Sequence, residues 1–442
     1  MSQPPRRTFS SSDEAALRTR RNITPTDNAG MIRISRRRFQ NSSSDDSEDA
    51  TALLESLALS SPSGSANADS ASVLSPVTEP ERDIMIEVPT NLHSETALQY
   101  LGLSPAAARD IMQAWTNVNS DDFADFCTFA KDYLENRGAS IDTGDYRSDW
   151  KPVLRRIGAS EKLIEAICQP GYDEVRLTKT ALGWVKEAME VRWEFLLQGE
   201  EASRQRARQI EGTNVPIQSF HAFTYQVGSG TSFDTIPTPA GETVLWKATT
   251  RIRAGNMWSN KLRQGEFDIQ SLVSSPPTDF NGWSKAYYWT PEMQGAIFYM
   301  KYCRAINHHA GACLVRLSVP NHIIEKEPAY ILRFPSEDFK KTVFFSRSGQ
   351  SLKKKVDIVL QHRLLIGDTT KGNSDVFNKL SKWEEVGEQH LVKLPDGSRM
   401  TQYVFDDDVA DEINKHCANK VHLVKENRPD EYLPPLSPAR HY

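Results

Sequence analysis

The chain is poor in cysteine, has no long apolar run and begins without a secretory pattern. Residues 1–7 carry two arginines with no apolar segment behind them, so no signal peptide is expected. No stretch approaches the roughly 18 consecutive apolar residues that a membrane helix needs. The five cysteines lie far apart and form no CxxC pair, which argues against a disulfide framework or a zinc site: Cys127, Cys168, Cys303, Cys313 and Cys417. These absences predict reduced thiols in a protein of the cytoplasm, the nucleus or both, not secreted and not attached to a membrane.

The common catalytic and nucleotide-binding signatures are missing too. There is no GxGxxG, GxxxxGK[ST], HExxH or GxSxG segment. The glycines of 228–230 lie in a Ser/Thr/Pro loop with no helix start behind them, so they do not form a phosphate cradle. The adjacent pair His308 and His309 has no acidic neighbour and fits a polar loop better than a metal site. No metal is therefore predicted.

The first 94 residues are rich in Ser, Arg and Asp and, up to residue 90, contain no Trp or Tyr. Such a segment buries too little apolar surface to offset its ordering entropy, which predicts a disordered tail. Its basic run 36–38 could serve nuclear import or nucleic-acid binding, although the net charge of −5 argues against a nucleic-acid surface over the whole chain. The acidic serines of 42–49 and the Ser-Pro pairs at 61–62 and 75–76 fit phosphorylation, and the apolar patch 53–59 fits docking on a partner. The alternative for each feature is a solvated tail without a dedicated reader.

Helical periodicity follows over residues 95–200. Ser104 and Pro105 give an N-cap and a first helical residue, and Ser160 caps another helix. The longest helix carries an aromatic and aliphatic stripe with Trp184 and Phe195, which is typical of a bundle core. We predict a small all-α domain without chemistry, which could bind an unknown protein partner, as could the tail. A charged linker over 201–218 and a flexible tail over 426–442 complete the boundaries.

Residues 219–425 show strand patterns with few helices, which predicts a mixed α+β domain. Residues 312–320 alternate as a half-buried strand ended by Pro320. Helices are expected to start at Thr290 and to cover residues 409–416. Further strands are expected at 244–246, 329–334, 342–345, 356–360, 364–366, 401–405 and 421–424.

The order of motifs in this part resembles the ADP-ribosyltransferase-like superfamily. The likeness is to the diphtheria-toxin and poly-ADP-ribose-polymerase type, in particular to its uncharacterised microbial members, and covers roughly 180 residues of the C-terminal half. It rests on a first strand, an amphipathic stretch, a turn, an Asp-Phe motif, an aromatic strand, a helix and an aliphatic strand, with late strands behind them. These are 245–249 (LWKAT), 251–262, 265–268 (GEFD), 278–280 (TDF), 286–290 (AYYWT), 293–303, 312–320, 365–368 (LIGD) and 401–405 (TQYVF).

The resemblance implies a split antiparallel sheet that binds NAD as substrate. In the family an aromatic residue stacks on nicotinamide, which places Tyr288 or Tyr287 there. Lys247 takes the place of the family's His or Arg at the ribose, and Thr249 would meet the nicotinamide amide and ribose. The motif with Asp279 and Phe280 would complete the cofactor site. The position of the catalytic glutamate is taken by Gln402.

Two of these positions, Lys247 and Gln402, hold residues that differ from those of the family. Gln402 donates hydrogen bonds but has no charge to stabilise an oxocarbenium-like transition state, and such a loss costs about 10² to 10³ in rate. Glu384 or Glu385 could supply the carboxylate, although a solvated loop is the simpler reading. Three functions stay open: an NAD-consuming transferase or glycohydrolase; an inactive relative that binds protein, nucleic acid or nucleotide; and a regulatory protein acting through its tail and helical domain.

Overall fold

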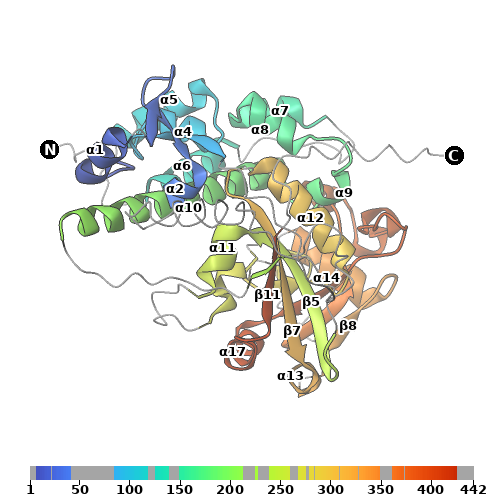
Figure 1. Cartoon of the computed structure of the whole chain (residues 1–442). Helices are drawn as coiled ribbons and strands as arrows, with labels where there is room; N and C mark the ends of the chain where they lie inside the picture. The colour runs from blue at the N-terminus through green and yellow to red at the C-terminus, as the bar shows by residue number, and fades with distance from the viewer. Residues whose placement is uncertain are drawn as a thin grey trace, which may run out of the picture. The chain divides into compact units, whose positions relative to one another are not determined.

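The computed structural model describes residues 6–20, 22–40, 84–117, 125–138, 149–212, 224–226, 238–258, 267–274, 278–282, 284–307, 309–326, 328–348, 361–372 and 374–425. Helices and small, mostly antiparallel sheets follow one another along this part of the chain (Figure 1). The predicted α+β class is confirmed. The acidic serines, the Ser-Pro pairs, the apolar patch 53–59, the glycines 228–230, the strand 356–360 and the tail 426–442 all lie outside the described residues.

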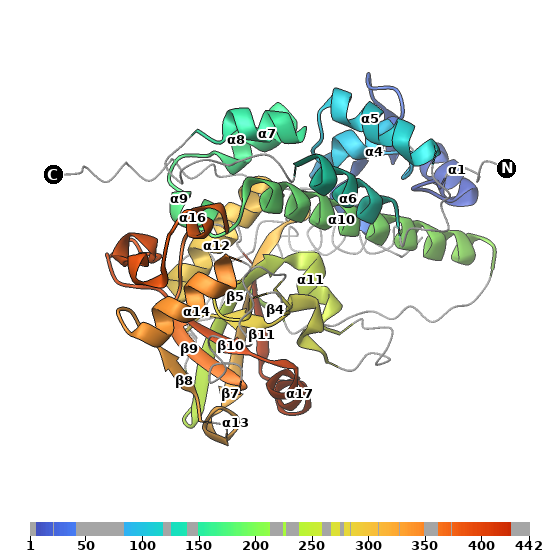
Figure 2. The ribbon, with the colours of Figure 1, turned by 180° about the vertical axis from the view of Figure 1, so that it is seen from behind.

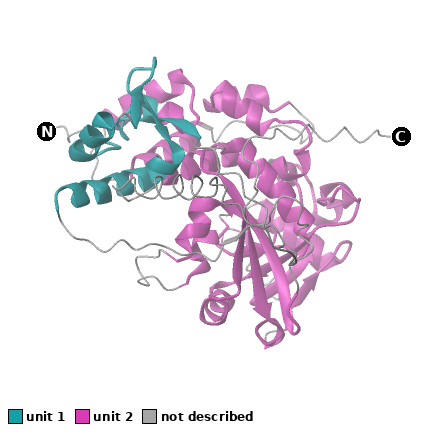
Figure 3. Cartoon of the chain, in the orientation of Figure 1, with its two compact units in different colours: residues 1–97, 196–219 teal, residues 98–195, 220–442 magenta. Residues whose placement is uncertain are grey.

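Two compact units divide the chain (Figure 3). Residues 1–97 and 196–219 form unit 1, and residues 98–195 and 220–442 form unit 2. Helix α10 (Ala181–Ile210) runs through both and continues well into the predicted linker 201–218. The helical segment 98–195 shares unit 2 with the α+β part, which differs from the separate helical domain expected from the sequence.

The described residues of unit 1 form helices and strands in segments where a disordered tail was predicted. The antiparallel strands β1 (Ile23–Pro25), β2 (Met31–Ser35) and β3 (Met85–Pro89) form a sheet in that order, accompanied by α1 (Ser11–Thr19) and α2 (Arg36–Gln40). The basic run 36–38 is thus part of a short helix. The unit gathers a small apolar core from side chains far apart in sequence: Phe9, Leu17, Ile32, Ile34 and Phe39.

The C-terminal half of α10 holds this core together. A Cβ at Gly199 would lie 1.9 Å from the Phe39 ring, so the glycine lets the ring pack directly on the helix. Arg206 donates through Nε and Nη2 to the two oxygens of Asp13, at 2.9 and 2.8 Å. No local pattern indicated these contacts, because each segment's partner lies about 160 to 200 residues away.

The helices of unit 2 begin where the cap residues predict. The Ser104 side chain caps α5 (Pro105–Thr116), and that of Ser160 caps α8 (Glu161–Ile167). Tyr302 packs edge-on against Trp184 of α10 and donates to the carbonyl of Ile167, which joins the helical segment to the α+β part. The remaining helices of this segment are α4 (Glu95–Tyr100), which begins in unit 1, α6 (Phe126–Gly138), α7 (Lys151–Ile157) and α9 (Asp173–Arg176).

The first sheet of unit 2 has the order β4-β11-β7-β5, with β7 at its centre (Figure 1). Its strands are β4 (Thr224–Gln226), β5 (Glu242–Thr250), β7 (Ala312–Pro320) and β11 (Val421–Lys425). All nine residues of β7 are buried, so the prediction of a half-buried strand is wrong. The reason is that α12 (Met293–Ile306) packs on one face of β7 while a second apolar cluster covers the other.

The second sheet has the order β6-β10-β9-β8 and is seen best from behind (Figure 2). Its strands are β6 (Tyr287–Trp289), β8 (Tyr330–Leu332), β9 (Leu364–Asp368) and β10 (Thr401–Phe405). Residues 342–345, predicted as a strand, belong instead to helix α14 (Glu337–Arg347), which Ser336 caps. Shorter elements are α11 (Arg251–Asn256), η3 (Ile269–Leu272), α13 (Asn321–Lys326), α16 (Ser374–Asn378), η5 (Trp383–Glu385), η6 (Glu388–His390) and α17 (Asp407–His416).

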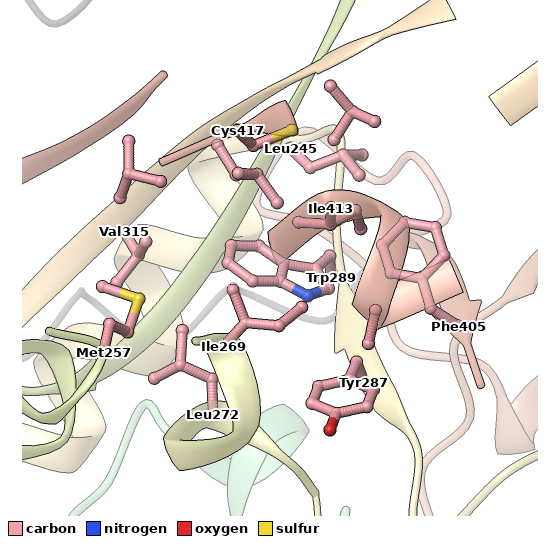
Figure 4. Packing of buried hydrophobic residues seen from close by; sticks show 14 of the residues in the cluster. Leu245, Met257, Ile269, Leu272, Tyr287, Trp289, Val315, Phe405, Ile413 and Cys417 are labelled. Carbon is pink, nitrogen blue, oxygen red and sulfur yellow. The ribbon is translucent and has the colours of Figure 1, made fainter. Parts of the chain in front are cut away.

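The two sheets meet where β5 passes β6. Trp246 and Thr290 exchange both backbone hydrogen bonds there, at 2.7 and 3.0 Å. A large apolar cluster lies beside this contact, with Tyr287 and Trp289 pointing into it (Figure 4). The contact fixes the outer edge of β5 next to the aromatic strand β6, and this junction positions the candidate site.

Candidate functional site

A cavity of about 240 Å³ lies at the junction of the two sheets. Residues 246–250 of the edge strand β5 form one wall, and β6, α12 and the start of β10 form others. Five of the seven residues predicted as site residues line it, although they are spread over 156 positions of sequence: Lys247, Thr249, Asp279, Tyr288 and Gln402. The segment before α10 and the helix itself close a further side with Lys179, Trp184 and Glu187.

Strand alternation separates the two candidate tyrosines. Tyr288 lines the cavity, and its hydroxyl accepts from the backbone N–H of Phe280 at 3.2 Å. Burial raises the pKa of Tyr288 well above its ordinary value, so the side chain stays a neutral phenol. Tyr287 points the other way into the apolar core (Figure 4). Phe280 is fully buried beside Phe339 and does not line the cavity. The stacking role therefore has one structural candidate, Tyr288.

Lys247 is half-buried, and its hydrogen-bond partners among the described residues are both neutral acceptors. Its Nζ donates to the Ser274 hydroxyl at 3.2 Å and to the Tyr288 carbonyl at 2.9 Å. Burial lowers the pKa of Lys247 to about 7, and the nearby cations of Lys179 and Arg253 add to this, against the opposite effect of Glu187. A pKa near neutrality favours the uncharged amine far more than in an ordinary lysine.

Asp279 is the centre of a buried hydrogen-bond network. Its carboxylate accepts from Arg347 Nε at 2.7 Å, from the Thr370 backbone N–H at 2.9 Å and hydroxyl, and from Gln402 Nε2 at 2.7 Å. Its side chain is 2% exposed and that of Arg347 6%. Arg347 also donates to the Thr178 carbonyl at 2.8 Å, which ties the segment before α10 to the network. The charge of Asp279 is thus neutralised within the cavity wall.

Gln402 is held as a hydrogen-bond donor. Besides Asp279, its amide nitrogen reaches the Asp368 carbonyl at 3.3 Å. A carboxylate in its place would face the carboxylate of Asp279 and lose both of these bonds, so the local environment suits an amide. Glu384 and Glu385, the alternative carboxylates, are exposed on the short helix η5 and do not line the cavity.

A second charged cluster was missed from the sequence. Arg253, directly behind β5, pairs with Glu187 at 2.6 Å, with Glu194 at 3.2 Å and with Glu190 at 3.6 Å. Burial alone would raise the pKa of Glu187, but Arg253 and Lys179 hold it well below its ordinary value. The available signal was the spacing of the three glutamates, three and four residues apart on one helix face.

Four of the residues that line the cavity carry a buried side-chain polar atom with no hydrogen-bond partner among the described residues. They are Thr278 Oγ1, Thr369 Oγ1, Asn307 Oδ1 and Trp289 Nε1, and each of these residues is at least 92% buried. Leaving a buried polar group unpaired costs about 1–3 kcal/mol, so a ligand that pairs with these atoms gains that much in return. The Trp289 indole points into the apolar core, which leaves the oxygens of Thr278, Thr369 and Asn307 as the candidates for pairing with a polar ligand.

The described residues contain neither a metal-binding cluster nor a helix that could span a membrane. No group of three or more His, Cys, Asp or Glu side chains is close enough to hold a metal ion there. None of the described helices combines the length and the apolar character that a bilayer crossing requires. All five cysteines are free thiols, and burial raises the pKa of the cavity-lining Cys303 to about 11.

Comparisons with known proteins add no relative to this description: no protein-family model, no curated protein and no solved structure matches the chain.

Proposed function

We propose that unit 2 binds NAD in this cavity as an ADP-ribosyltransferase-like domain, and that it cleaves the bound NAD slowly if at all. One observation carries the proposal. The three positions that the resemblance assigned to the ribose contact, the stacking residue and the catalytic residue, Lys247, Tyr288 and Gln402, line one cavity from three different strands.

The chemistry of the wall supports a nicotinamide riboside end in this cavity. The phenol ring of Tyr288 offers an aromatic face for the nicotinamide ring. Thr369 Oγ1 and Asn307 Oδ1 have no partner among the described residues and suit ribose hydroxyls or the carboxamide. The volume of about 240 Å³ is below the roughly 300–1,000 Å³ of most ligand pockets, so the adenosine end would lie outside it.

The charges explain why cleavage is expected to be slow. Breaking the bond to nicotinamide builds positive charge on the ribose, and an uncompensated carboxylate is needed to stabilise it. The two carboxylates that line the cavity, Glu187 and Asp279, are both paired with cations. The amide of Gln402 is turned to Asp279. Binding without efficient chemistry is the function that this set of groups supports best.

A second candidate is an NAD glycohydrolase or ADP-ribosyltransferase with Asp279 as its carboxylate. The observation in its favour is that Asp279 lines the cavity beside Gln402 and Tyr288. In that case a small movement of Arg347 on substrate binding would free one carboxylate oxygen for the ribose.

The binding test is calorimetric titration of NAD into the full chain. We expect Tyr288→Ala to weaken binding about tenfold or more, because the stacking face is lost, and Tyr288→Phe to retain it. Tyr330→Phe, on the edge strand β8 and away from the cavity, is the matched control. No heat of binding at millimolar NAD would rule out the proposal.

The cleavage test follows nicotinamide release in the same samples. We expect the wild type to stay at the level of a protein-free blank, and Gln402→Glu to bind less NAD without releasing nicotinamide, since the new carboxyl faces Asp279. Release by the wild type that Asp279→Asn abolishes would instead establish the second candidate.

A further inference from the structure

Lys247 differs from the other cavity lysine in its partners. Lys179 pairs with Glu187 at 3.0 Å, whereas Lys247 has no carboxylate partner among the described residues. Elsewhere in unit 2, Lys371 and Lys420 each pair with a glutamate as well. A lysine placed in a cavity wall without a counter-ion is poorly suited to carry a charge.

The hydrogen bonds of Lys247 fit a neutral amine. An ammonium has three N–H donors, and a neutral amine has two donors and a lone pair. Lys247 has two acceptors, the Ser274 hydroxyl and the Tyr288 carbonyl. With both hydrogens engaged, the lone pair is left as the group available to the cavity. The depressed pKa of about 7, caused first by burial, agrees with this count.

We propose that Lys247 is a nucleophilic amine that captures an aldehyde ligand in the cavity as a Schiff base. The Nζ lone pair attacks the carbonyl carbon, and a C–N bond forms. The two hydrogens of Nζ leave with the carbonyl oxygen as one water molecule, which gives the C=N bond without any oxidant or reductant. The Ser274 hydroxyl, which accepts one of these hydrogens and has its own to donate, is placed to pass a proton to that oxygen.

The wall indicates which aldehydes suit the site. The aromatic residues Trp184, Tyr288 and Tyr299 line the cavity, and so do Thr369 and Asn307, whose side-chain oxygens have no partner among the described residues. This combination suits a small hydroxylated aldehyde, such as an open-chain sugar, better than a purely apolar one. The inference does not depend on NAD, because it uses only the amine and the cavity.

The test is reductive trapping on the full wild-type chain. Glyceraldehyde is added at pH 7 with cyanoborohydride, which reduces the C=N bond to a stable secondary amine, and the modified lysines are mapped by mass spectrometry. About half of an amine with a pKa of 7 is neutral at pH 7, against roughly one in 2,500 for an ordinary lysine. Allowing for lower intrinsic nucleophilicity, we expect Lys247 to react about 10²-fold faster than Lys285, an exposed lysine on the approach to β6.

The pH profile and denaturation provide a second readout from the same protein. The groups that face Lys247 are Lys179 before α10, Glu187 on α10, Arg253 on α11 and Cys303 on α12. We expect the trapping rate at Lys247 to reach half its maximum near pH 7, and the preference over Lys285 to vanish in urea. Equal rates at Lys247 and Lys285 in the folded protein, or a preference that survives in urea, would overturn the proposal.

Two variants separate the amine from the cavity. Lys247→Arg keeps a cation but removes the nucleophile, and we expect the fast adduct to disappear. Lys179→Arg keeps the ion pair with Glu187, and we expect the adduct at Lys247 to persist. If the fast adduct disappears in Lys179→Arg and persists in Lys247→Arg, the reactive amine is Lys179 and the proposal is wrong. Slower trapping of Lys247 when NAD is present would support the proposed NAD site. Trapping at an unchanged rate would count against NAD binding in the cavity, but not against Lys247 as the reactive amine.

Discussion

Among the described residues, unit 1 and unit 2 each contain a deeply buried arginine–aspartate pair, and the two pairs have different surroundings. Arg206 and Asp13 are 1% and 2% exposed, and Arg347 and Asp279 are 6% and 2% exposed. In unit 1 the pair joins helix α1 to α10. Arg206 also donates through Nη1 to the Arg38 carbonyl at 3.1 Å. In unit 2 the aspartate also accepts from Thr370 and Gln402 and lines a cavity.

The comparison shows that the same bond can serve two purposes. A buried pair gives little net stability relative to apolar packing, yet losing one partner is costly because a bare charge remains. In unit 1 the Asp13–Arg206 pair connects two segments that lie far apart in sequence, and we call this pair the clamp. Around Asp279 the extra donors fix the orientation of Gln402, so the pair shapes a site wall. The difference lies in the additional donors and in the neighbouring cavity.

The largest effect is expected from Asp279→Ala. Arg347 would remain buried without its counter-ion, at a cost of about 3–5 kcal/mol, and the Thr370 N–H and Gln402 amide would lose their acceptor, at about 1–3 kcal/mol more. Hydrogen exchange at the amides of β9 and β10 measures this loss. The double variant Asp279→Leu with Arg347→Met is the control, and should recover most of the stability. If the single variant exchanges like the wild type, Asp279 is not the centre of the network.

Arg206→Met is expected to cost about 3–5 kcal/mol within unit 1, because Asp13 would be left buried and unpaired. The effect should appear as faster hydrogen exchange and faster proteolysis of residues 6–40. NAD binding, which the proposal places in unit 2, should not change. Exchange that accelerates equally in β5 and β10 would show that the two pairs belong to one cooperative structure and would break the comparison.

Several predicted site residues line one cavity, whereas the fold of unit 1 was not anticipated. Strands β5 and β10 were expected from apolar and aromatic runs, and β6 from the family resemblance, which also singled out Lys247, Tyr288 and Gln402. These runs form strands through local preference and period, which a sequence displays directly. The orientation of Tyr288 and not Tyr287 toward the cavity required knowledge of which face of β6 meets the core.

Unit 1 was missed because its apolar residues are few and their partners are remote. Phe39 packs on Gly199, and Asp13 pairs with Arg206, across sequence separations that no local pattern reveals. The error at 342–345 has a different cause, since β-branched and aromatic residues favoured a strand. Ser336 with Glu337 and Asp338 was a helix start signal that outweighed them, and Phe339 and Val343 lie four apart on the buried face.

The smallest expected effect is the pH dependence that Lys247 adds to the stability of the chain. It also distinguishes the cavity of unit 2 from the Asp13–Arg206 pair of unit 1. The pKa of this lysine is about 7 in the folded chain, against the model-peptide value of about 10.4 when unfolded. Between these values the unfolded chain binds a proton that the folded chain does not. Stability therefore rises with pH across this window, and is reduced as pH falls toward 7.

Lys247→Met should remove that slope. Since the side chain is partly solvated, we expect the variant to exceed the wild type by about 1–2 kcal/mol at pH 7, with the gap closing toward pH 10. Urea unfolding of both proteins between pH 7 and pH 10 measures the difference, and Lys285→Met, at an exposed lysine, should show none. The clamp in unit 1 contains no lysine, so a probe of residues 6–40 should report the same pH dependence in both proteins. A gap that is constant with pH would mean that Lys247 is charged in the folded chain, and that its effect is one of packing alone.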